Sequence, residues 1–73
     1  MIKNADTAKK VSELLLQCSS KFNESARLVQ VEASDEEFKR YRRAVGAVMG
    51  ELLFEVLKPL YSEHPELKPE GFA

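Results

Sequence analysis

Residues that could carry chemistry are few in this chain of 73 residues. It has one histidine, His64, and one cysteine, Cys18, which is too few for the usual Cys/His zinc site or for an internal disulfide. His64 lies between Glu63 and Pro65, with no partner at metal-ligand spacing. A catalytic histidine also needs a nucleophile and an orienting group, and the sequence nominates neither. We therefore expect a surface histidine.

The remaining reactive side chains indicate no active site. Cys18 falls on an apolar position in the middle of a predicted helix, so we expect a buried and inert thiol. Glu51 and Glu55 form a helical i, i+4 pair of carboxylates, but di-metal sites in bundles need inward Glu-x-x-His motifs. No histidine follows either residue at that spacing, so both should face solvent. The sequence predicts no metal, no cofactor and no enzymatic activity.

The densest cluster of charge is basic and consists of Lys39, Arg40, Arg42 and Arg43. Such cations can grip phosphate, and arginine adds a forked geometry. A helical wheel scatters them, however, and three acidic residues come just before them. The net charge of -1 gives no overall field to attract nucleic acid. We expect a solvated, ion-paired surface, and binding of nucleic acid or another polyanion is the alternative function.

The elements that must position these side chains are two helices, because apolar residues recur every three or four positions and nothing alternates with a period of two. The first apolar face consists of Ala8, Val11, Leu15, Cys18, Phe22, Ala26 and Val29. It predicts a helix over about 5–31, capped by Asn4 or Asp6. Ser34 and Glu37 form a capping box that starts a second helix over about 35–58. Pro59 should end or kink this helix, and Leu60 and Tyr61 could continue it as a short turn.

Only two to four residues connect the predicted helices, so they should lie side by side as an antiparallel hairpin. The sequence thus predicts an all-α hairpin domain over 1–61 and an extended, proline-containing tail over 62–73. The tail either packs along the bundle or serves as a recognition segment for another protein.

The second helix has apolar residues most of the way round. One stripe, which should meet the first helix, consists of Phe38, Tyr41, Val45, Val48, Met49, Leu52 and Val56; the other consists of Gly46, Gly50, Leu53 and Leu57. One neighbour cannot cover both stripes, and small chains without metal or disulfides often self-associate. We predict a homodimer that forms a four-helix bundle through the second stripe. A tetramer or a different protein partner would meet the same demand.

Gly46 and Gly50 have the same orientation on the second helix. Because glycine inside a helix costs about 1 kcal/mol against alanine, the pair indicates a close backbone approach. That approach is either to the dimer partner or to the first helix, unless the spacing is incidental.

No secretory leader or membrane span is evident, since no stretch approaches eighteen uninterrupted apolar residues, so we expect a cytoplasmic protein. The leading hypothesis is a non-enzymatic, homodimeric helical module that binds another protein. The polyanion-binding regulator is second, and an enzyme with its active site between protomers is third.

Overall fold

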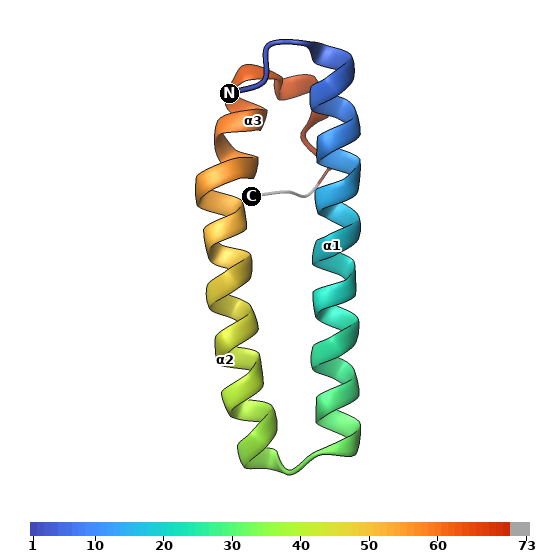
Figure 1. The fold of residues 1–73 in the computed structure, drawn as a ribbon, viewed down its shortest axis with the longest axis vertical. Helices are drawn as coiled ribbons and strands as arrows, with labels where there is room; N and C mark the ends of the chain where they lie inside the picture. The colour runs from blue at the N-terminus through green and yellow to red at the C-terminus, as the bar shows by residue number, and fades with distance from the viewer. Residues whose placement is uncertain (71–73) are drawn as a thin grey trace.

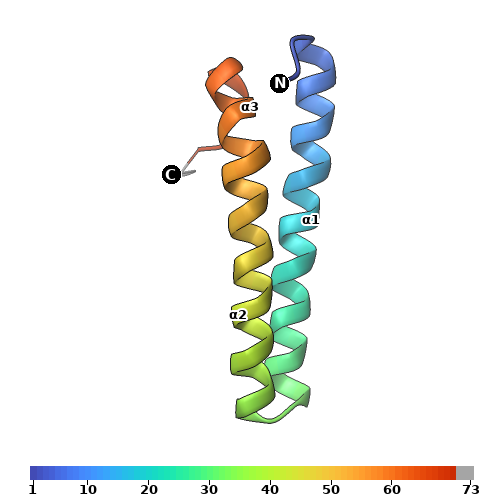
Figure 2. The ribbon, with the colours of Figure 1, turned by 60° about the vertical axis from the view of Figure 1, so that its left-hand side comes forward.

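The computed structural model describes residues 1–70 as two long antiparallel helices joined by a short turn (Figures 1 and 2). Helix α1 spans Ala5–Glu32 and helix α2 spans Asp35–Leu52. A π-helical segment, η1 (Leu53–Leu57), and helix α3 (Lys58–Glu63) continue α2 without a break. A short 3-10 turn, η2 (Pro65–Leu67), follows. The predicted all-α hairpin is confirmed, and no residue of this range lies in a strand.

Both helices begin where the sequence predicts, because polar caps satisfy their first amides. At the start of α1, the Thr7 N–H donates to Oδ1 of Asn4 at 3.0 Å. At the start of α2, the Glu37 N–H donates to Oγ of Ser34, and the Ser34 N–H donates back to Oε1 of Glu37, each at 3.2 Å. These two reciprocal bonds complete the capping box.

Of the two alternatives predicted at Pro59, an end of the helix is wrong, since the helical chain continues to Glu63 with an irregular turn before the proline. Proline cannot donate a backbone hydrogen bond, and its ring crowds the carbonyl four residues earlier. The turn before it widens: the Lys58 N–H bonds to the carbonyl of Leu53, five residues back. Pro59 then lies in the first turn of α3, where a missing N–H is tolerated.

The wide turn also changes which side chains face α1. A π turn holds one extra residue, so every later side chain is rotated by about 100° from its α-helical position. Leu57, predicted on an outward stripe, is only 3% exposed and packs with Leu60 and Tyr61. Leu53 packs against the same cluster. The outward placement of Leu57 was wrong because it assumed a regular helix.

The core lies at the end of the hairpin opposite the turn, beside the N-terminus (Figure 1). Its buried members are Ala8, Leu57, Leu60 and Tyr61, and Ile2, Leu15, Leu52, Leu53 and Leu67 pack around them. Ser12 is buried there, with its hydroxyl 2.6 Å from that of Tyr61. Within residues 1–70, Val45 is the one buried apolar side chain in the other half. That half is a thin layer of two helices.

The predicted tail is helical rather than extended over its first part, because α3 and η2 continue as far as Leu67. Leu67 packs against the core cluster, which agrees with the expectation that the tail packs on the hairpin. Residues 71–73 of that tail lie outside the described part of the chain.

Replacing Leu60 by alanine tests the position of the core. Leu60 is fully buried, so the cavity and lost transfer energy should lower the free energy of unfolding by about 2–5 kcal/mol. Val31→Ala, at a side chain 78% exposed, should change it by less than about 0.5 kcal/mol. Urea denaturation followed by circular dichroism measures both. Equal effects would contradict a core at this end.

Candidate functional site

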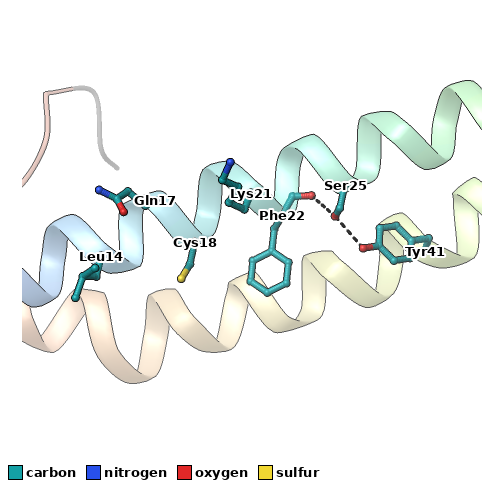
Figure 3. A pocket seen from close by; sticks show the side chains of 7 residues that line it. All are labelled: Leu14, Gln17, Cys18, Lys21, Phe22, Ser25 and Tyr41. Atoms are coloured by element: carbon teal, nitrogen blue, oxygen red, sulfur yellow. Dashed lines mark hydrogen bonds between the residues drawn. The ribbon is translucent and has the colours of Figure 1, made fainter.

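A groove of about 520 Å³ opens between α1 and α2, midway along the hairpin (Figure 3). Its walls are Leu14, Gln17, Cys18, Lys21, Phe22 and Ser25 from α1 and Tyr41 from α2. Cys18 and Phe22 point toward α2, whereas Gln17 and Lys21 point away from it (Figure 3). The interior of the groove is therefore apolar, and its polar groups lie at the rim.

The groove belongs to a longer apolar surface, which we call the groove face. On α1, Leu28 lies seven residues after Lys21 and fourteen after Leu14, so it shares their side of the helix. On α2, Ala44 and Val48 follow Tyr41 by three and seven residues and share its side. The groove face consists of Leu14, Cys18, Phe22, Leu28, Tyr41, Ala44 and Val48. Leu14 is 60% exposed, Leu28 57% and Val48 50%.

One polar link crosses the groove face and sets the register of the helices. The Tyr41 hydroxyl donates to Oγ of Ser25 at 2.8 Å, and that hydroxyl donates to the carbonyl of Phe22 at 2.7 Å (Figure 3). Counting equal steps away from this link along the antiparallel helices places Val48 level with Cys18. Both hydroxyls are engaged within the fold, so they act as structural groups in the groove wall.

A second groove, of about 400 Å³, opens on the opposite side and is lined by Leu16, Ser19, Met49, Gly50, Leu53 and Leu57. Gly50 lies nine residues from Tyr41, which is half a turn around α2. The stripe predicted as the dimer interface lies here. Gly46 is exposed, Gly50 and Leu53 are half-buried, and Leu57 is buried in the floor.

The two glycines make no close contact within the hairpin. A Cβ atom added to Gly46 or Gly50 would meet nothing within 4 Å. Close packing of these positions against the first helix is therefore excluded as the reason for the pair. A contact with another chain and an incidental spacing both remain.

The basic cluster is open to solvent. Lys39, Arg40, Arg42 and Arg43 are all exposed, and the ion pairs found in residues 1–70 involve other side chains. The predicted solvated surface is confirmed, whereas the predicted ion pairs of these residues are not found in residues 1–70. The guanidinium of Arg42 instead lies 5.6 Å from the ring centre of Phe38, a distance suited to a cation–π contact.

The other candidate residues divide between confirmed and corrected predictions. Glu51 and Glu55 are exposed, as predicted. Cys18 is exposed, and its predicted burial was wrong because α2 does not cover that edge of α1.

Over residues 1–70 we find no group of three His, Cys, Asp or Glu side chains placed to hold a metal ion. No helix in that range is sufficiently long and apolar to traverse a bilayer.

His64 is buried, which corrects its predicted position at the surface. Helix α3 carries it beneath the N-terminal residues, where its Nε2–H donates to the carbonyl of Ile2 at 2.6 Å. Beside it, the Met1 ammonium pairs with the carboxylate of Glu63, and the Ile2 N–H donates to the other oxygen at 3.1 Å. These contacts, which we call the terminal clamp, join the N-terminal residues to the end of α3.

Sequence reasoning missed the groove face because polar residues interrupt it. Lys21 and Ser25 lie between Leu14 and Leu28 on the same stripe of α1, so the stripe does not stand out as apolar. The available signal was the spacing of the two leucines, which are two heptads apart on one side of the helix.

Comparison of this chain with family models, with curated proteins and with solved structures gives no match. The functional argument therefore depends on the geometry of the hairpin itself.

The terminal clamp predicts a dependence of stability on pH. A hydrogen bond from the Met1 ammonium is the main reason that the pKa of Glu63 lies below its ordinary value of 4.5. A lowered folded-state pKa means stabilisation that is present above pH 4.5 and is lost as the pH falls through the folded pKa. Glu63→Gln should therefore melt below wild type at pH 7 and lose less stability on acidification.

The control for this prediction is Glu13→Gln, at an exposed position on α1. Thermal melts between about pH 3 and pH 7 compare the three proteins, and Glu13→Gln should follow wild type. A melting curve for Glu63→Gln that also matches wild type at every pH would contradict the clamp.

Proposed function

We propose that this chain is a non-enzymatic helical interaction module that works as a homodimer, with two hairpins packed into a four-helix bundle. The observation that carries the proposal is the uncovered groove face. Leu14, Leu28 and Val48 are each at least half exposed around an apolar groove. Contiguous apolar patches of several hundred Å² typically mark interaction sites in proteins.

The surface area of one hairpin supports the same proposal. It exposes 5661 Å², whereas a compact monomer of 8.3 kDa should expose about 4,600 Å² by the area–mass relation. The difference of roughly 1,100 Å² exceeds the ~800 Å² that each partner loses in a standard protein interface. One hairpin therefore has enough surplus surface for a stable dimer.

Two faces compete for the second copy. The sequence favours Gly46, Gly50, Leu53 and Leu57, whereas the exposed leucines favour the groove face. The face left free by the dimer would then be open to another protein. The proposed setting is the cytoplasm, an expectation that comes from the sequence alone.

Sedimentation equilibrium of the pure wild-type chain tests the proposal. At tens of micromolar chain we expect a mass twice that of the 8.3 kDa chain, because burying the groove face removes exposed apolar side chains from water. A mass of one chain over the whole concentration range would contradict the homodimer. A mass of four chains would replace it with a tetramer.

Binding of nucleic acid or another polyanion is a second candidate function, favoured by one observation. The exposed basic residues of α2 form no ion pair in the described part of the chain, so they are free to meet phosphates. Such binding weakens steeply with salt, because phosphate contacts release counterions.

Anisotropy of a fluorescent oligonucleotide, measured across a salt series, tests this second candidate. Polyanion binding predicts association at low salt and a marked loss in Arg40→Glu/Arg43→Glu, since each reversal replaces a cation that would face phosphate. Arg27→Glu, an exposed control on α1, should bind like wild type. The absence of binding at low salt would rule the candidate out.

A further inference from the structure

We propose that the second copy docks on the groove face, with the two α1 helices antiparallel about a two-fold axis beside Lys21. In this arrangement Leu14 of each chain packs against the partner's Leu28. The inference rests on the proposed homodimer and specifies which of the two competing faces forms it.

The spacing of the exposed leucines suits a two-fold interface. Leu14 and Leu28 are fourteen residues apart, which is about 21 Å along α1, and Lys21 lies midway between them. An interface between identical copies must be self-complementary, so that residue i meets j and j meets i. An axis beside position 21 brings position 14 onto position 28, and the groove lies between these two contacts.

The charge nearest the proposed axis is that of Lys21, and it is compensated within its own helix. Nζ of Lys21 lies 3.4 Å from Oε2 of Glu24 in the same helix, and both side chains are exposed. An axis beside position 21 brings the two Lys21 ammonium groups close to each other, and each of them already has the carboxylate of its own Glu24 as a compensating partner.

The dimensions of the hairpin fit a standard interface. Its extents are 44 × 19 × 16 Å, and the groove between the helices opens onto the broad face. The surplus of roughly 1,100 Å² over a compact monomer exceeds the ~800 Å² that each partner of a typical stable complex buries. A second hairpin laid along this face can cover its full length.

The opposite face is less suited to a second copy. Lys39 and Arg43 lie seven residues before Gly46 and Gly50, so they share the glycine stripe. Both cations are exposed, and two copies joined there would bring like charges together. Leu53 and Leu57 are the largest side chains predicted for that interface. Leu57 is already buried within its own hairpin.

Directed disulfide formation tests the arrangement. In a Cys18→Ser background, the variant Leu14→Cys/Leu28→Cys should oxidise to a covalent dimer on a non-reducing gel. The two cysteines of one chain are about 21 Å apart, too far to bond to each other. Glu13→Cys/Arg27→Cys is the matched control, because it has the same spacing at exposed positions outside the groove face. It should give at least tenfold less covalent dimer.

The wild-type thiol provides a second test that needs no engineered cysteine. Cys18 is exposed in a lone hairpin and lies within the proposed interface. Its rate of alkylation should fall as the chain concentration rises and the dimer forms.

Sedimentation of the unmodified chain separates the possible failures. A dimer mass with no excess of Leu14–Leu28 crosslinks over the control, or with alkylation that ignores concentration, would overturn the groove-face arrangement and leave the homodimer standing. A single-chain mass would overturn both. A dimer mass with selective crosslinks and protected Cys18 supports both.

Discussion

Two helices packed side by side can each cover only the arc of the other that faces them, and this constraint explains most of the hairpin. In the half near the turn, the described residues form only the two helices, and Val45 is the one apolar side chain buried there. At the other end α3, the N-terminal residues and η2 supply additional cover, and the core forms there. Among the described residues no third element reaches the groove face, so its leucines remain exposed in a single hairpin.

The wide turn before Pro59 is what makes the terminal core possible. The extra residue in η1 changes the directions of Leu57, Leu60 and Tyr61, which pack in one cluster with Ala8. Burial of these apolar side chains offsets the poorer geometry of a π turn. The same rotation removes Leu57 from the outward stripe of α2, and this weakens the glycine face as an interface, whereas Leu14, Leu28 and Val48 of the groove face stay exposed.

The sequence was informative where structure depends on neighbouring residues and less so where it depends on distant ones. The capping residues Asn4 and Ser34 fixed both helix starts, and the short connection fixed the antiparallel hairpin. Whether Pro59 ends a helix or widens its turn depends on what the following residues gain by packing, which local sequence does not contain. The groove face was hidden because Lys21 interrupts its stripe, and the exposure of Cys18 depends on how far α2 covers the edge of α1.

The dependence of the melting temperature on chain concentration tests the central claim most directly, because it asks whether covering the hairpin from outside contributes to its stability. If folding and association are linked, mass action requires the melting temperature to rise with chain concentration. We predict a steady rise over a hundredfold range at neutral pH. A melting temperature that stays constant over that range would show that one hairpin tolerates its exposed leucines alone, and would contradict the account.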